Sequence, residues 1–373
     1  RRHPISGVLA ARCRFIAGGA GGATSTDIKG SLMTVQRGDV VLEAHDLVRS
    51  FRARASHGLF AKKRTVAAVD GVNIQLRAGE VLAIVGESGS GKSVLSRLLA
   101  RIVAPSSGSL SLHGQAVDLA QRRDLAYASQ VQLVLQDPFA SINPIHKTAH
   151  SINRALLLHG TAPKEVDQRA EELLESVSLT PPKQYLERYP HELSGGQLQR
   201  INIARGLAVN PEVLLADEPI SMLDVSVRLG VLNLLRELSD SRLLATMYIT
   251  HDIASARYIA DETAVMYAGQ VVERARGTAV MDNPVHPYTQ LLIASVPNPS
   301  DLSAQERLSQ SSSSSTTFNY EGCRFSPRCP VALDICRGNL PPEVQVAEGH
   351  VVRCWLPASD EQRSAVTISS KAK

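Results

Sequence analysis

The stretch from Val81 to Ser93 constrains this chain more than any other. A short apolar run, which predicts a buried strand, is followed at once by Gly-Glu-Ser-Gly-Ser-Gly-Lys-Ser, and this fits the phosphate-binding pattern G-x-x-x-x-G-K-[ST]. Apolar residues then recur at helical spacing until Pro105. Strand, glycine loop and helix come in the order that binds an anion, because loop N–H groups and the helix N-terminus can both face it. The alternative, a chance glycine turn before a lysine, is disfavoured by the correct flanks.

The loop supplies the first candidate binding residues. They are Gly86, Glu87, Ser88, Gly89, Ser90, Gly91, Lys92 and Ser93. We expect the Lys92 ammonium to reach the β- and γ-phosphates of a nucleotide, and the Ser93 hydroxyl to hold Mg²⁺.

A second apolar strand, predicted at Val213–Ala216, ends in the carboxylates Asp217 and Glu218. A carboxylate at the carboxyl end of such a strand can hold Mg²⁺ through water, and its neighbour can polarise an attacking water. We therefore predict that Asp217 is a magnesium contact and Glu218 the catalytic base. Two exposed carboxylates without a function are the alternative, which the preceding phosphate loop disfavours.

A Ser-Gly-Gly turn opens another predicted helix. The turn comprises Ser194, Gly195 and Gly196, followed by Gln197. It creates a second helix N-terminus with free N–H donors. Two anion-binding helix starts on a chain with one phosphate loop suggest that the second start serves another subunit. An ordinary N-cap would be the better interpretation if this turn stood alone.

The remaining pattern alternates apolar strands with helical runs, which predicts an α/β fold with a mostly parallel, covered sheet. The run Thr148–Ser178 predicts a helical insertion. No apolar run reaches the roughly eighteen residues that a membrane span needs. The net charge of +4 is too small for this length to indicate a nucleic-acid partner.

Together these motifs resemble, in order and spacing, the ATP-binding subunits of ABC transporters from about Val40 to Thr278. The resemblance implies ATP and Mg²⁺ as cofactors. It adds two catalytic candidates: Gln136, a contact to Mg²⁺ and water that also senses the membrane partner, and His251, which would contact the γ-phosphate and orient Glu218. It also implies that residues 194–197 close over the γ-phosphate of the opposite subunit, and that Asp224 crosses the dimer interface.

Longer stretches resemble the oligopeptide and dipeptide importer branch. They are Gln136–Pro144, Tyr189–Leu193, Asp224–Val227 and Asn283–Thr289. This resemblance implies ATP-driven peptide import with two membrane-spanning permease subunits, a second, related ATPase and, indirectly, an extracytoplasmic peptide-binding protein. It places the chain on the cytoplasmic face of the cell membrane, as a peripheral subunit without a nucleic-acid partner.

The expected organisation has three parts. Residues 1–36 form a disordered leader or extension, and residues 37–282 form an ABC-type P-loop nucleotide-binding domain with a helical subdomain at about 140–197. Residues 283–373 form a C-terminal extension with a small four-cysteine unit, after a linker at Ser311–Ser315.

The cysteines of this extension are Cys323, Cys329, Cys336 and Cys354. Their spacing lacks the paired C-x₂₋₄-C of common zinc modules, and a reducing cytoplasm disfavours disulfides. Four thiolates can hold an iron–sulfur cluster, and the segment around Cys329 resembles the tail of importer ATPases, some of which carry [4Fe–4S]. Zinc and free or structural thiols are the alternatives.

Other functions fit part of the pattern. A close relative with a cargo such as nickel, glutathione or sugar would share these motifs, because cargo selectivity resides in other subunits. A soluble ABC ATPase without a transporter usually has two ATPase halves or a long coiled coil, neither of which is evident here. A non-hydrolysing regulatory subunit is disfavoured by the presence of Glu218 and His251.

Overall fold

The computed structural model describes residues 35–54, 63–120, 124–295 and 318–359. The predicted leader therefore lies almost wholly outside the described residues, as does the serine run. Among the described residues, no helix has the length and apolar character needed to cross a membrane.

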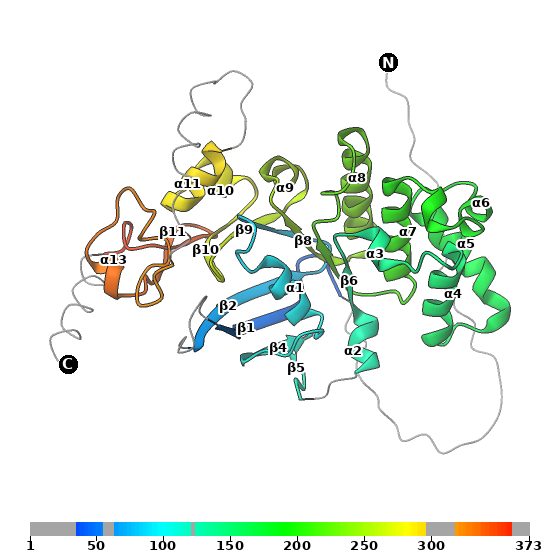
Figure 1. The fold of residues 1–373 in the computed structure, drawn as a ribbon, viewed down its shortest axis with the longest axis horizontal. Helices are drawn as coiled ribbons and strands as arrows, with labels where there is room; N and C mark the ends of the chain where they lie inside the picture. Colours follow the sequence, from blue (N-terminus) through cyan, green and yellow to red (C-terminus); the bar gives the residue numbers. More distant parts are fainter. Residues whose placement is uncertain (1–34, 55–62, 121–123, 296–317, 360–373) are drawn as a thin grey trace. The chain divides into compact units, whose positions relative to one another are not determined.

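The strand that precedes the phosphate loop lies inside the larger of two sheets (Figure 1). The order of this eight-stranded sheet is β11-β12-β10-β9-β3-β8-β7-β6. Its strands are β3 (Val81–Val85), β6 (Val131–Val134), β7 (Val213–Asp217), β8 (Ala245–Thr250), β9 (Glu262–Tyr267), β10 (Gln270–Arg276), β11 (Glu343–Ala347) and β12 (His350–Arg353). The run β9-β3-β8-β7-β6 is parallel, as predicted, whereas β10, β12 and β11 add an antiparallel edge.

Strand β3 is covered on both faces, which explains its continuous apolar run. Val81, Ala83 and Val85 contribute to one hydrophobic core, and Leu82 and Ile84 contribute to another. Successive side chains of a strand point to opposite faces, so a strand buried on both sides needs apolar residues at every position. Strands β7 and β8 are buried along their whole length as well.

The second sheet is antiparallel, with the order β2-β1-β4-β5. Its strands are β1 (Val40–Arg54), β2 (Lys63–Arg77), β4 (Ser107–Leu112) and β5 (Gln115–Ala116). Helix α1 (Lys92–Leu99) shares one core with both sheets through Leu95, Leu98 and Leu99. The helix that begins at the phosphate loop is therefore fixed by apolar packing between the sheets.

The predicted helical insertion is a group of short helices (Figure 1). It contains α3 (Pro138–Ser141), α4 (Thr148–Leu158), α5 (Val166–Ser176), α6 (Pro182–Leu186) and α7 (Gly195–Leu207). The helical run predicted at Thr148–Ser178 is broken in the middle, because Gly160 has φ +91° and Pro163 follows it. The other helices of the core are α2 (Leu125–Gln130), α8 (Val225–Arg242) and α9 (Ile253–Ile259).

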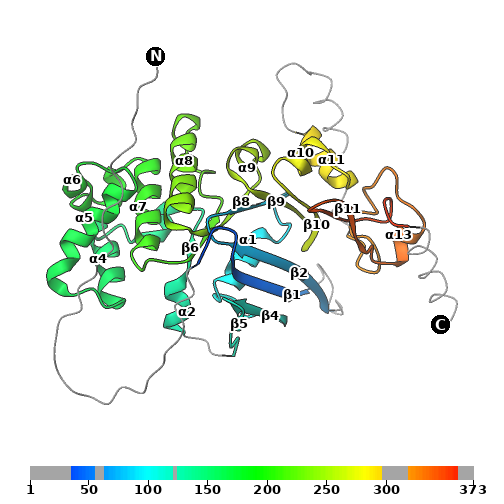
Figure 2. The ribbon, with the colours of Figure 1, turned by 180° about the vertical axis from the view of Figure 1, so that it is seen from behind.

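The C-terminal residues continue the main sheet where the sequence predicts a separate small unit. Strand β12 pairs with β10, and β11 pairs with β12. Figure 2 shows β11 beyond β10, on the side of the sheet near α13. The Phe325 ring is buried in the main core. The helices of this region are α10 (Ala279–Asp282), α11 (Pro287–Ala294) and α13 (Ile335–Gly338). A smaller apolar cluster contains Cys336, Trp355 and Ala358.

Candidate active site

The glycine loop connects β3 to α1 and requires glycine at two positions. A Cβ at Gly86 (φ +155°) would lie 2.2 Å from the Met266 carbonyl oxygen, and one at Gly91 (φ +105°) would lie 2.1 Å from that of Ala68. Side chains cannot be accommodated at such distances, and both φ values lie in the region that glycine favours. The neighbouring backbone therefore fixes the curvature of the loop.

The Lys92 side chain folds back onto this loop. Its Nζ donates hydrogen bonds to the carbonyl oxygens of Gly86 (2.8 Å) and Glu87 (2.9 Å), and the residue is 4% exposed. Burial lowers the pKa of the ammonium, and the carboxylates of Glu218, Asp217 and Glu87 act in the opposite direction. The loop thus holds a buried cation whose protons point at its own carbonyl groups, and an incoming anion can compete for them.

On the other side of the loop, the Ser93 hydroxyl donates a 2.9 Å hydrogen bond to Asp217 Oδ1. Asp217 is 3% exposed, and burial raises the pKa of its carboxyl group, which the Ser93 hydrogen bond partly offsets. Buried carboxylate and hydroxyl oxygens are the hard donors that Mg²⁺ prefers. The donor set at the end of β7 therefore fits this ion, and Gln136 adds an amide oxygen nearby.

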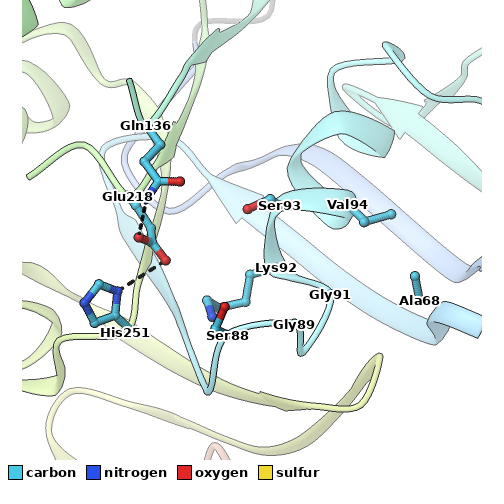
Figure 3. Close-up of a pocket in the computed structure, with 10 residues that line it drawn as sticks. All are labelled: Ala68, Ser88, Gly89, Gly91, Lys92, Ser93, Val94, Gln136, Glu218 and His251. Carbon is cyan, nitrogen blue, oxygen red and sulfur yellow. Dashed lines mark hydrogen bonds and ion pairs between the residues drawn. The ribbon is translucent and has the colours of Figure 1, made fainter. Parts of the chain in front are cut away.

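Glu218 follows β7 with an unusual backbone. Its φ is +47°, a left-handed conformation that is uncommon for residues other than glycine and tends to cluster at functional sites. Its N–H donates to the Ile249 carbonyl of β8 (3.0 Å), which anchors the turn. The carboxylate accepts a hydrogen bond from Gln136 Nε2 at 2.9 Å and lies 3.3 Å from His251 Nδ1 (Figure 3).

These groups line a cavity of about 510 Å³, a size typical of small-molecule sites. Figure 3 shows Gln136, Glu218 and His251 on one side of it and Ala68 and Val94 on the opposite side. The lining residues are Ala68, Ser88, Gly89, Gly91, Lys92, Ser93, Val94, Gln136, Glu218 and His251. Residues of the loop and residues at strand ends, which are far apart in sequence, thus line the same cavity.

The remaining candidates lie elsewhere. Ser194 caps α7, and its hydroxyl and the Gln197 side chain exchange hydrogen bonds with each other's backbone N–H groups. Neither residues 194–197 nor Asp224 line the cavity among the described residues. A Cβ at Gly196 would lie 2.3 Å from Val227 Cγ1, so the start of α7 packs closely on the start of α8, which Asp224 precedes.

The four C-terminal cysteines are free thiols, and Cys354 lies close enough to the other three to be affected by their charge. Burial raises the pKa of the Cys354 thiol to about 11, and the other three thiols add to this. Burial likewise raises the pKa values of Cys323 and Cys329. Among the described residues, no three His, Cys, Asp or Glu side chains converge closely enough to hold one metal ion. A zinc site, with all sulfurs about 2.3 Å from one ion, is therefore not formed.

The number and kind of these donors still fit an iron–sulfur cluster. A [4Fe–4S] cluster takes one thiolate per iron atom and spreads its ligands over four metal ions. The thiols fit as a donor set, although their arrangement in this structure is not that of a metal centre.

Two contacts to the phosphate loop, and a third interaction beside it, are missing from the sequence-based prediction. The Glu87 N–H donates to the Tyr288 hydroxyl (2.9 Å), and Arg328 donates to both Glu87 carboxylate oxygens (2.9 and 3.0 Å). Arg324 donates to the Asp70 carboxylate and the Ala268 carbonyl, beside residues that touch the loop. The only sequence signal was that both arginines lie in the cysteine segment.

Comparison with known proteins explains this arrangement. A family model for the ABC transporter matches residues 69–221, and a model for the oligopeptide/dipeptide transporter C-terminal region matches residues 272–336. The chain is 40% identical to the oligopeptide transport ATP-binding protein AppF of Bacillus subtilis, over 87% of this chain and 99% of AppF. It belongs to the oligopeptide/dipeptide branch of the ABC transporter ATP-binding proteins. This family makes it an ABC-type ATPase.

Other relatives agree. The dipeptide transport ATP-binding protein DppF of Haemophilus influenzae is 40% identical over 80% of this chain and 91% of its own length. The solved structure of cbiO1 from Clostridium perfringens, part of the ABC transporter complex cbiONQ, matches with a TM-score of 0.56 at 24% identity, over 66% of this chain and 92% of that one. This structural match confirms the ABC ATPase fold with its mixed α/β sheets.

Proposed function

We propose that this ATPase powers the import of peptides across a membrane. The observation that carries this proposal is the match of residues 272–336 to the oligopeptide/dipeptide transporter C-terminal region. These residues lie outside the match to the general ABC transporter family, which ends at residue 221. The names of relatives at about 40% identity support it. As a peripheral subunit on the cytoplasmic face, the chain would work with two permease subunits, a second, related ATPase and an extracytoplasmic peptide-binding protein.

In this proposal Glu218 is the general base of ATP hydrolysis. Its carboxylate lies between Gln136 and His251 at the edge of the cavity, within reach of a water there. His251 orients Glu218 and contacts the γ-phosphate. The loop N–H groups and Lys92 bind the phosphate chain.

Oxygen atoms of Ser93, Asp217 and Gln136 would hold Mg²⁺ at this site. The ion, when bound, neutralises phosphate charge, and the buried Asp217 carboxylate supplies the negative charge that attracts it.

Residues 194–197 and Asp224 serve the site of a second subunit. They pack together at the starts of α7 and α8, away from the cavity of their own chain. Helix α7, with 13 residues, begins with Gly195 and Gly196, whose backbone N–H groups can meet an anion across an interface.

The test of peptide import is reconstitution with the permease pair and partner ATPase in vesicles, with a labelled peptide and its binding protein present. We expect ATP hydrolysis and peptide uptake to rise together. Hydrolysis that responds to nickel or glutathione and not to peptide would favour another cargo. Failure to co-purify with any membrane protein would favour a soluble role.

We further propose that Cys323, Cys329, Cys336 and Cys354 hold a [4Fe–4S] cluster. The support is a set of four free, neighbouring thiols. Protein purified without oxygen is expected to contain about four irons and to absorb broadly at roughly 400 nm, where such clusters absorb. The C354S variant should lose both signals. Colourless, iron-free protein would contradict the cluster, and bound zinc would favour the alternative metal.

A further inference from the structure

The phosphate-binding loop carries a carboxylate that is held from outside the ATPase core. Glu87 lies within the loop, and its side chain is 41% exposed. Both of its carboxylate oxygens accept hydrogen bonds from Arg328, and its N–H donates to Tyr288. Both partners lie in the C-terminal part of the chain, so this part forms hydrogen bonds with both the backbone and the side chain of Glu87.

Arg328 is well fixed for this contact. Its N–H donates to the Phe325 carbonyl (2.9 Å), and the Phe325 ring is 1% exposed among Tyr267, Tyr288 and His286. The guanidinium lies over the Tyr267 and Phe325 rings, with its carbon 5.8 and 5.7 Å from their centroids. The arginine is therefore anchored to the core through an aromatic cluster, and its planar fork matches the carboxylate.

A free Glu87 carboxylate would oppose nucleotide binding. It already acts electrostatically on the Lys92 ammonium, the group placed to bind phosphates. An uncompensated negative charge at this point would both compete for Lys92 and repel a polyanion. Pairing with Arg328 weakens both effects, since the guanidinium partly compensates the charge of the carboxylate and fixes its position.

We propose that Arg328 is a positioning residue for ATP binding, which holds the Glu87 carboxylate away from Lys92 and compensates its charge. The C-terminal segment thereby sets the nucleotide affinity of the loop. This inference rests on the ATPase activity of the family and does not depend on peptide cargo or on a metal cluster.

The test is the Kd of ATP for the full-length protein, measured by calorimetry without Mg²⁺ so that hydrolysis does not interfere. R328A should raise the Kd about threefold to tenfold at low salt, the range for losing a partly exposed charge pair and leaving one charge behind. The rise should shrink as salt increases. R353A is the matched control, because Arg353 pairs with Glu343 in the same region, away from the loop.

The decisive comparison is the double variant. In an E87Q background R328A should have no further effect on the Kd, since the carboxylate that Arg328 restrains is gone. R328K, which keeps the charge and loses the fork, should lie between wild type and R328A. If R328A lowers the Tm more than R353A does, the Kd of R328K separates the effect of the lost charge pair from that of lost stability. An unchanged Kd in R328A and R328K, or an equal rise with and without Glu87, would overturn the proposal.

Discussion

On one side of the phosphate-binding loop, Ser93 and Asp217 share a hydrogen bond between buried elements of the main sheet, whereas on the other side Glu87 pairs with Arg328, 241 residues further along the chain. Asp217 is 3% exposed and the Glu87 side chain is 41% exposed. The first side is held by the apolar packing of α1 and the buried strands β3 and β7. The second depends on a charge pair that solvent and salt can weaken. We therefore expect the buried Ser93–Asp217 contact to be the more rigid of the two, and the exposed Glu87–Arg328 contact to be the more adjustable.

Removing the Phe325 ring, which anchors the C-terminal segment in the core, should have the largest effect on the Glu87–Arg328 side. F325A deletes a buried ring, and we expect a loss of about 3–5 kcal/mol in the free energy of unfolding. It should also raise the Kd of ATP, because Arg328 loses its support. Urea unfolding and ATP calorimetry measure the two effects.

The matched control is I152A, which removes a fully buried side chain from α4, far from this segment in sequence. It should destabilise the protein without changing the Kd of ATP. Equal changes of Kd in both variants would show that affinity follows general stability and not the anchor.

His286 offers a pH test of the same anchor. This buried residue caps α11, and burial lowers its pKa from 6.5 to about 4. As the pH falls, His286 is protonated in the unfolded chain before it is protonated in the folded one. Its contribution to the free energy of unfolding is therefore complete above pH 6.5 and is lost as the pH drops toward 4, by about 3 kcal/mol in total. H286N, which can still cap the helix, should show a shallower fall in the free energy of unfolding over this window. Parallel curves for the two proteins would exclude this role.

The smallest effect is expected at the start of α7. S194A removes an N-cap and should cost about 1 kcal/mol of stability, as should D124A at the start of α2. If Ser194 serves a second subunit, S194A alone should slow hydrolysis in the assembled pair, with ATP binding to the separate chain unchanged. Equal hydrolysis rates in the two variants would restrict Ser194 to capping.

Much of the side of the phosphate-binding loop that carries Asp217 was predictable from the sequence. Ser93, Asp217 and Glu218 each follow or end a strand, and the carboxyl ends of parallel strands meet at one edge of a sheet. The position of His251 beside Glu218, and a place for Gln136 at the same site, came only from the family resemblance, because a lone glutamine or histidine after a strand carries little signal. The roles of these residues remain predictions.

The C-terminal contacts could not be predicted in this way. The pairing of Arg328 with Glu87 joins residues with no common periodicity, and the pairing of β12 with β10 depends on a register that spacing does not encode. The backbone of Glu218, at φ +47°, is likewise set by the hydrogen bond to Ile249 and not by its own preference.

The rate of ATP hydrolysis by an E218Q variant is the most direct test of Glu218 as the general base. The matched control is E212Q, since Glu212 immediately precedes β7 at its opposite end and pairs with His113. We expect E218Q to lose at least about a hundredfold in rate, the effect of removing a general base, and to accumulate as an ATP-bound closed dimer. E212Q should hydrolyse ATP at nearly the wild-type rate. Wild-type turnover in E218Q would contradict the assignment of Glu218 and the proposed hydrolytic site.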